Sequence, residues 1–213
     1  MNSVEKFYHI KKQINTHLNN TELIVVTKSF DFEKISPLLK TGHLHFGENK
    51  VQEATSKWSP ILKKNSDINL HLLGHLQSNK VSEAVSIFNF IHSLDSEKLA
   101  IKLKEAENNV NRKLKYFIQV NLGNEPQKYG IPSSHVANFL NFCRNEAQLD
   151  VIGLMCIPPI TNNPGNFFSQ LKSLSTLNKL SELSMGMTDD YLEAIKYGAT
   201  FIRIGSGIFG KRL

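Results

Sequence analysis

The chain has 213 residues, of which 40% are hydrophobic and 21% charged, and its formal net charge is +6. This length suits one large domain, the composition is that of a globular protein, and no apolar run approaches the length of a membrane span. The positive charge does not indicate nucleic-acid binding, because the lysines are dispersed among acids and form no basic tract.

The amino-terminal residues and the cysteines indicate a cytoplasmic protein. The segment Met1–Lys6 lacks the apolar core of a signal peptide, and Glu5 argues against a mitochondrial presequence. Cys143 and Cys156 fit neither a disulfide framework nor a metal-binding spacing. We therefore expect a reducing, cytoplasmic compartment, with neither a membrane nor nucleic acid as partner.

In chain order, the sequence begins with an amphipathic helix over Val4–Leu18 and then alternates between apolar, β-rich runs and amphipathic segments. Such continuously apolar runs are typical of parallel strands that are covered on both faces. The eight predicted strands are Glu22–Lys28, His43–Asn49, Ile68–Gly74, Phe88–Asp95, Leu114–Gly123, Asp150–Pro159, Glu182–Met187 and Thr200–Gly205. The seven predicted helices between them are Phe32–Lys40, Lys50–Lys63, Ser78–Ser86, Ser96–Asn109, Ser133–Ala147, Pro164–Leu180 and Asp189–Tyr197.

Eight βα-like units favour an α/β fold with a single (β/α)8 TIM barrel, and an open doubly wound sheet is the alternative. We assign residues 1–213 to one domain, with residues 1–20 as an extra N-terminal helix packed on the barrel. A barrel would make the first and last strands neighbours, which would bring Lys28 and Arg203 to the same carboxyl-end mouth. Phosphate sites of barrels often lie after strands seven and eight, here residues 184–188 and 205–207.

Arg203 lies inside an apolar run and precedes a glycine-rich turn. A buried guanidinium is costly unless neighbouring groups accept its hydrogen bonds. Glycines such as Gly205 and Gly207 let backbone N–H groups approach an anion closely. The combination predicts a site for a phosphorylated ring, and the alternative is an internal salt bridge from Arg203 to an acid such as Glu48.

Lys28 ends the run Leu-Ile-Val-Val-Thr-Lys and would share a strand face with Ile24 and Val26. Apolar surroundings favour the neutral form of an amine, and a neutral amine can form a Schiff base with an aldehyde. The alternative is an ordinary solvent-exposed lysine just past a strand end.

Several shorter patterns have simpler interpretations. The pairs His43-x-His45, which would share a strand face, and His71-x-x-x-His75 could be metal ligands, but no carboxylate cluster accompanies them, so we expect no metal site. Cys156 is expected to be a small apolar filler. Asn49 with Gln52, and Thr188 before two acids, have the pattern of helix N-caps.

Eight segments together resemble the YggS/PROSC family of pyridoxal 5′-phosphate (PLP) homeostasis proteins. In order and at family spacing they cover nearly the whole chain: residues 25–28 (VVTK), 46–53 (FGENKVQE), 71–80 (HLLGHLQSNK), 91–95 (IHSLD), 119–122 (QVNL), 153–158 (GLMCIP), 183–190 (LSMGMTDD) and 203–210 (RIGSGIFG).

The resemblance implies a PLP barrel of fold type III, similar to the N-terminal domain of alanine racemase. It implies that Lys28 holds PLP as a Schiff base, that Arg203 faces the pyridine nitrogen and that Asn49 lies near the ring. Because a guanidinium keeps its proton, Arg203 would disfavour protonation of that nitrogen, which makes the ring a weak electron sink.

The resemblance also implies a phosphate cup. Its expected members are Ser184, Met185, and the backbone of Gly205 and Ser206. The family often has a proline two or three residues after the lysine, which this chain lacks, and its N-terminal helix is short for the family.

By this resemblance the chain is a PLP carrier that buffers and delivers the cofactor without turnover, with no catalytic residues. Its expected partners are PLP and PLP-dependent apo-enzymes as recipients, and it would be a monomer or a weak homodimer. The alternative is a fold-type III amino-acid racemase or decarboxylase. Such racemases take a tyrosine from an additional β-domain, for which we expect no room in 213 residues. A Schiff-base aldolase ranks last, because the run 151–157 offers no lysine.

Overall fold

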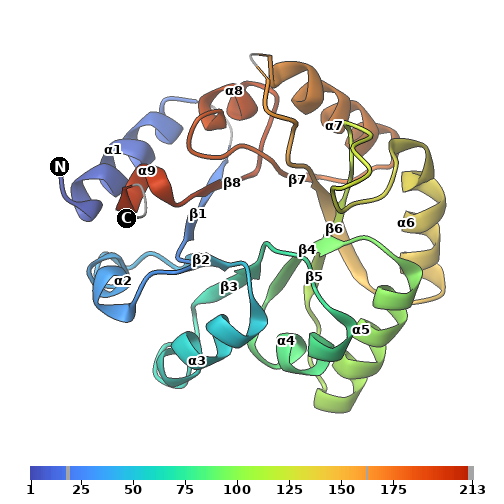
Figure 1. Cartoon of the computed structure of the whole chain (residues 1–213), viewed down its shortest axis with the longest axis horizontal. Coiled ribbons are helices and arrows are strands. Elements are labelled where there is room, and N and C mark those ends of the chain that lie inside the picture. Colours follow the sequence, from blue (N-terminus) through green and yellow to red (C-terminus); the bar gives the residue numbers. More distant parts are fainter. Residues whose placement is uncertain (18–19, 162, 211–213) are drawn as a thin grey trace.

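The computed structural model describes residues 1–17, 20–161 and 163–210. Eight parallel strands form a closed barrel in sequential order, and β8 pairs with β1 (Figure 1). The strands are β1 (Glu22–Val26), β2 (His45–Glu48), β3 (Asn69–Leu72), β4 (Phe90–Leu94), β5 (Lys115–Gln119), β6 (Asp150–Met155), β7 (Glu182–Ser184) and β8 (Phe201–Ile204). The predicted (β/α)8 barrel is confirmed, and the open sheet is wrong.

Helices surround the strands on the outside of the barrel, as Figure 1 shows. They are α1 (Ser3–Asn15), α2 (Phe32–Leu39), α3 (Val51–Leu62), α4 (Val81–Ile87), α5 (Glu97–Val110), α6 (Val136–Asn145), α7 (Gly165–Leu177), α8 (Tyr191–Lys196) and α9 (Ser206–Phe209). Two 3-10 turns, η1 (Ser78–Lys80) and η2 (Ser133–His135), precede α4 and α6. Each predicted helix has a counterpart. Most are shorter than predicted, because residues at the predicted ends form caps or 3-10 turns.

The first helix packs on the outside of the barrel next to α2 and α9. Phe7, Ile10 and Ile14 are buried on one face of α1, as the helical spacing predicted. Tyr191 at the start of α8 donates a hydrogen bond from its hydroxyl to Gln13 on this helix. The predicted helix extended to Leu18, which lies outside the described residues.

Side chains alternate between the inside and the outside of the barrel, because successive residues of a strand point to opposite faces. The outer core lies between the strands and the helices and includes Phe46 and Trp58. The inner core is smaller and consists of Ile24, Val26, Leu73, Phe90, Phe117, Met155 and Phe201. Polar side chains that also point inward are therefore surrounded by apolar groups.

The short helix α9 follows β8 directly, where the sequence predicted only a turn. Four residues are too few to show helical periodicity, and a Gly-Ser-Gly composition is typical of turns. The Phe209 ring of α9 packs against Phe30 in the loop after β1, with ring centroids 4.5 Å apart. This contact ties the loop after the first strand to the loop after the last.

Candidate functional site

Lys28 lies in the loop after β1, two residues past the end of the strand at Val26, and its side chain is half-buried. The register of β1 with β8 pairs Ile24 with Arg203 and Val25 with Ile204. Lys28 and the loop that follows Arg203 therefore meet at the carboxyl-end mouth, as the barrel predicted. Gly205 approaches this strand so closely that a Cβ there would lie 3.2 Å from the carbonyl oxygen of Val26.

The residues on either side of Lys28 are bound to charged groups. The Thr27 hydroxyl donates to Glu48 Oε1 at 2.6 Å, and the Thr27 carbonyl accepts from Lys57 Nζ at 2.8 Å. On the other side, the backbone N–H of Ser29 donates to Glu53. Ser29 has a left-handed backbone, with φ of 62°. The loop thus holds Lys28 between two anchored neighbours.

These anchors form one charge cluster at the end of β2 and on α3. Lys57 Nζ lies 2.9 Å from Glu48 Oε1 and 3.0 Å from Glu53 Oε1, and the indole N–H of Trp58 also donates to Glu48 at 2.9 Å. Burial opposes ionisation of Glu53, but hydrogen bonds from Lys57 and Ser29 leave its pKa below the usual range. Glu48 faces α3, so the alternative in which Glu48 pairs with Arg203 is wrong.

Arg203 is buried inside the barrel near the same mouth, with only 5% of its surface exposed. Its Nη1 donates to Ser184 Oγ at 2.7 Å, and its Nη2 donates to the carbonyl of Cys156 at 2.9 Å. Burial lowers the pKa of this guanidinium. Among the described residues, no carboxylate forms an ion pair with it.

Ser184 and Met185, two predicted members of the phosphate cup, lie at and just after the end of β7. Both are fully buried, and the Ser184 hydroxyl contacts Arg203 and His92 Nδ1, the latter at 2.8 Å. The backbone N–H of Met185 donates to the carbonyl of Phe201. Their assignment to cofactor binding stays a prediction, and the Ser184 side chain is a hydrogen-bond partner of Arg203.

The Thr188 hydroxyl, which the sequence predicted to cap a helix, instead contacts the loop after β8. Its Oγ1 lies 3.0 Å from Ser206 Oγ and accepts from the backbone N–H of Gly207 at 3.2 Å. The N-cap of α8 is Asp190, so the cap prediction for Thr188 is wrong. Loops after β7 and β8 are thereby joined where barrels commonly bind phosphate. The sequence held a signal for this contact, because each of the two loops has a hydroxyl residue, Thr188 or Ser206, close to a glycine.

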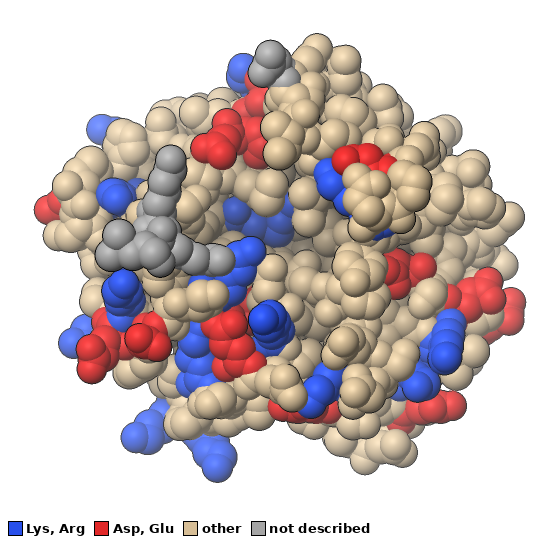
Figure 2. All heavy atoms as spheres, viewed as in Figure 1, with Lys and Arg blue, Asp and Glu red and all other residues tan. Residues whose placement is uncertain are grey.

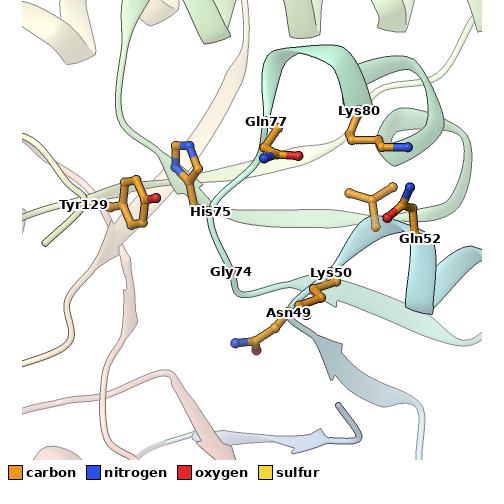
Figure 3. A pocket seen from close by; sticks show the side chains of 9 residues that line it. Asn49, Lys50, Gln52, Gly74, His75, Gln77, Lys80 and Tyr129 are labelled. Carbon is orange, nitrogen blue, oxygen red and sulfur yellow. The ribbon is translucent and has the colours of Figure 1, made fainter. Parts of the chain in front are cut away.

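Asn49 follows β2 and lines a cleft of about 460 Å³ beside the mouth (Figure 3). Its predicted capping role is wrong, because α3 begins after Lys50 without a side-chain cap. Across the cleft, His75 stacks on Tyr129 with centroids 3.8 Å apart, and its Nδ1 lies 3.6 Å from Asp95. Asn49 directly follows Glu48, whose carboxylate accepts a hydrogen bond from Thr27, the neighbour of Lys28.

The two histidine pairs that could have bound metal are separated. The ring of His43 packs against Phe7 and Phe46 outside the barrel, whereas the ring of His45 faces the inside. The predicted shared strand face is therefore wrong. His71 is buried inside the barrel, while His75 is exposed at the mouth. Within the described ranges, no group of three or more His, Cys, Asp or Glu side chains is arranged to hold a metal ion.

The face seen in Figure 2 carries basic and acidic side chains in alternation, with basic atoms in the hollow near its centre.

Of the helices in the described part of the chain, none combines the length and the apolar character needed to cross a membrane. Burial raises the pKa of the Cys156 thiol to about 12, as expected for a filler rather than a nucleophile.

Comparisons with known proteins agree with this geometry. The family model described as alanine racemase, N-terminal domain, matches residues 3–212. A pyridoxal phosphate homeostasis protein of Pasteurella multocida (strain Pm70) is 33% identical, over 98% of this chain and 94% of that protein. The structure of PipY from Synechococcus elongatus PCC7942 with PLP bound is 34% identical and superposes with a TM-score of 0.88, over 98% of this chain and 100% of that one.

More distant structures share the fold alone. Alanine racemase of Clostridium difficile 630 superposes with a TM-score of 0.74 at 12% identity, and the match covers 97% of this chain but 56% of the racemase. Three relatives that are matched over 89% to 94% of their length are named as homeostasis proteins rather than as enzymes. The chain belongs to the family of the alanine racemase N-terminal domain and, within it, to the pyridoxal phosphate homeostasis proteins.

Proposed function

We propose that this protein binds pyridoxal 5′-phosphate covalently on Lys28 and serves as a carrier that buffers and delivers it. The observation that carries the proposal is the pairing of β1 with β8, which brings Lys28 to the loop that follows Arg203. An amine, a buried cation and two loops that carry the hydroxyls of Thr188 and Ser206 then surround one mouth. The name of the Pasteurella relative and the ligand of PipY support the choice of PLP.

The residues present fit this cofactor. Gly205 and Gly207 bring the backbone close to β1 and to Thr188, where a Cβ on Gly207 would lie 2.9 Å from Ile204 and 3.1 Å from Thr188. The hydroxyls of Thr188 and Ser206 would hold the phosphate together with this backbone. Arg203 would donate to the pyridine nitrogen, and Asn49 would border the ring.

When bound, the cofactor supplies an aldehyde that accepts a primary amine. Lys28 would add its neutral nitrogen to the aldehyde carbon and release one water. The anchored Thr27 and Ser29 would keep this nitrogen oriented. Because Arg203 keeps its proton, it would hold the ring nitrogen as a hydrogen-bond acceptor, which supports binding better than carbanion chemistry.

The absence of turnover belongs to this proposal and is supported by the relatives, which are named for homeostasis. Delivery to PLP-dependent apo-enzymes is proposed on the same ground. The alternative, a racemase or decarboxylase, would need an acid–base group opposite Lys28. The single-domain assignment, the cytoplasmic location and the monomer or weak dimer expected from the sequence stay predictions.

A borohydride experiment tests the proposal. Purified protein is incubated with PLP, reduced, digested and mapped by mass spectrometry. We expect the pyridoxyl mass on the peptide that contains Lys28, no such mass in Lys28→Ala, and wild-type labelling in Lys50→Ala, the matched control at the same mouth. Label on other lysines, with Lys28 untouched, would refute the covalent site.

A second experiment separates a carrier from an enzyme. Loaded protein is incubated with each L-amino acid, and the D-enantiomer and released CO₂ are measured. We expect neither to accumulate beyond one equivalent of protein. Sustained production of either would favour the racemase or decarboxylase.

A further inference from the structure

Three histidines and one serine form a continuous hydrogen-bonded row across the inside of the barrel. His45 Nδ1 lies 3.0 Å from His71 Nε2, and His71 Nδ1 lies 2.9 Å from His92 Nε2. His92 Nδ1 lies 2.8 Å from Ser184 Oγ, which accepts from Arg203 Nη1 at 2.7 Å. We call His45, His71 and His92 the histidine row. It runs from the amino-terminal end of β2 to the guanidinium beside the proposed cofactor.

The histidine row lies among aromatic rings. His71 stacks on Phe90, with centroids 4.3 Å apart and planes 12° apart, and His92 stacks on Phe117 at 4.2 Å and 17°. His71 and His92 are fully buried, and His45 is half-buried at the amino-end opening. Desolvation lowers the pKa of all three imidazoles, and the charge of Arg203 lowers that of His92 further. Each ring is therefore neutral, with one N–H donor and one acceptor nitrogen.

Arg203 sets the direction of these hydrogen bonds. A guanidinium can only donate, so Ser184 Oγ accepts from it. The Ser184 hydroxyl must then donate its own hydrogen, and within the described part of the chain its acceptor is His92 Nδ1, 2.8 Å away. His92 must carry its proton on Nε2 and donate to His71.

The same logic continues along the histidine row. His71, which accepts at Nδ1, carries its proton on Nε2 and donates to His45 Nδ1. His45, which accepts at Nδ1, then carries its own proton on Nε2. The opposite direction would leave the buried Ser184 hydrogen without an acceptor, which costs more than a lost hydrogen bond.

We propose that the histidine row and Ser184 are positioning residues for Arg203, which fix its guanidinium against the pyridine nitrogen by a hydrogen-bond chain of single direction. A hydroxyl that donates to an imidazole is a stronger acceptor, because hydrogen bonds in a chain polarise one another. Each imidazole therefore strengthens the bond from Arg203 to Ser184. The inference rests on the proposed place of the ring beside Arg203.

The direction of the chain is tested first on protein without cofactor. Nitrogen-15 NMR of histidine-labelled protein reports which ring nitrogen carries the proton. We expect His45, His71 and His92 all in the Nε2–H form. A proton on Nδ1 of His92 would overturn the proposal. This measurement does not depend on PLP, so it stands even if the proposed function fails.

Variants then test the effect on Arg203. In His92→Asn the side-chain oxygen takes the place of Nδ1, whereas His92→Leu removes the acceptor. We expect His92→Leu and Ser184→Ala to weaken PLP binding about five- to tenfold, the effect of losing roughly one hydrogen bond, and to shift the absorption maximum of the bound cofactor. We expect His92→Asn to stay within about twofold of wild type by the same reasoning.

Two controls keep the result interpretable. Borohydride labelling of Lys28 must persist in each variant, which separates a loosened Arg203 from a lost covalent link. His43→Leu removes a buried histidine outside the row and should leave the spectrum unchanged. If His92→Leu does not fold, Ser184→Ala and the remote pair His45→Leu and His45→Asn replace it. The Asn oxygen takes the place of His45 Nδ1, so only His45→Leu should shift the spectrum. A folded His92→Leu or Ser184→Ala with wild-type affinity and spectrum would refute the proposal.

Discussion

The Lys57 ammonium lies 2.9 Å from the Glu48 carboxylate, where side-chain exposures are 10% and 0%. Both groups also bind Thr27, one through its hydroxyl and the other through its carbonyl. The pair therefore connects the interior of the protein to the residue that precedes Lys28. Charges so deeply buried are strongly coupled, and removal of one leaves the other without compensation.

Lys57→Met should destabilise the fold and impair the site. We expect the free energy of unfolding to fall by about 3–5 kcal/mol, the usual effect of breaking a buried ion pair, and the rate of borohydride-trapped labelling on Lys28 to decrease. Denaturant titration and mass spectrometry measure the two effects. The exposed lysine of the Lys196–Glu193 pair is the matched control, and Lys196→Met should leave both unchanged.

A double variant separates charge from packing. In Lys57→Met/Glu48→Gln neither charge remains, so we expect stability to recover part of the loss. If the double variant is less stable than Lys57→Met, the cluster does not act as a compensated charge pair.

Thr188→Val should weaken binding through the phosphate. The variant keeps the shape of the side chain but loses the acceptor for the Gly207 N–H and the contact with Ser206 Oγ. We expect the Kd for PLP to rise about five- to tenfold, since one or two hydrogen bonds are lost, and the Kd for pyridoxal, which has no phosphate, to stay constant. Fluorescence titration with both ligands measures this.

The control for Thr188 is Thr55→Val, because the Thr55 hydroxyl donates to the carbonyl of Val51 in its own helix, at 3.0 Å, away from the loops after β7 and β8. An equal loss of affinity for PLP and for pyridoxal in Thr188→Val would show that this loop contacts some other part of the ligand.

His43 should make the fold sensitive to acid. Burial, followed by the charge of Lys11, lowers the pKa of His43 from 6.5 to about 4. Between pH 6.5 and pH 4 the unfolded chain therefore binds a proton on His43 that the folded chain does not bind. The stability that is present above pH 6.5 is lost as the pH falls toward 4. One such histidine removes about 2 kcal/mol between pH 7 and pH 5. His71 and His92 act in the same direction.

Denaturant unfolding of wild type and His43→Gln at the two pH values isolates this contribution. The glutamine can keep the donor to the His45 carbonyl, which His43 Nε2 contacts at 2.9 Å, without titrating. We expect the variant to lose less stability than wild type on acidification, whatever its stability at pH 7. An unchanged stability difference between variant and wild type would mean that the pKa of His43 is the same in the folded and the unfolded chain.

The fold was predictable because each strand has a continuous apolar pattern and each helix an amphipathic one. Lys28 and Arg203 were predictable for the opposite reason, since each is a cation beside or inside an apolar run. Ser184 was assigned to the phosphate by the family resemblance, whereas its contacts with Arg203 and His92 could not be predicted. The partner of a side chain inside a closed barrel depends on which strands face each other across the interior. The residue pattern of a single strand does not specify this.

The histidine row shows the same limit. The sequence singled out His45 and His71 only as members of two possible metal pairs, and it gave no reason to single out His92. Their contacts join β2, β3, β4 and β7, so they become evident only when the strands are placed in space. Spacing along the chain suggested His43 with His45 and His71 with His75, whereas the barrel pairs His45 with His71 and His71 with His92.

Arg203→Ala should change the bound cofactor more than the fold of the mouth. The variant removes the donor to Ser184 Oγ and to the Cys156 carbonyl, and it removes the cation proposed to face the ring nitrogen. We expect PLP affinity to fall at least about tenfold, as for a charge-assisted hydrogen bond, and the absorption maximum to shift, because the ring nitrogen could then bind a proton.

Arg112 provides the matched control, since it too is partly buried and donates to two backbone carbonyls, those of Val85 at 2.7 Å and Phe88 at 3.1 Å. Arg112→Ala should lower stability through these lost bonds while the cofactor spectrum stays that of wild type. Titrating the absorbance of loaded Arg203→Ala from pH 6 to pH 9 adds a second readout. Protonation of the ring nitrogen should make that spectrum depend on pH where the wild-type spectrum does not. If Arg203→Ala binds PLP with unchanged affinity and spectrum, the pyridine nitrogen lies elsewhere and the proposed orientation of the cofactor is wrong.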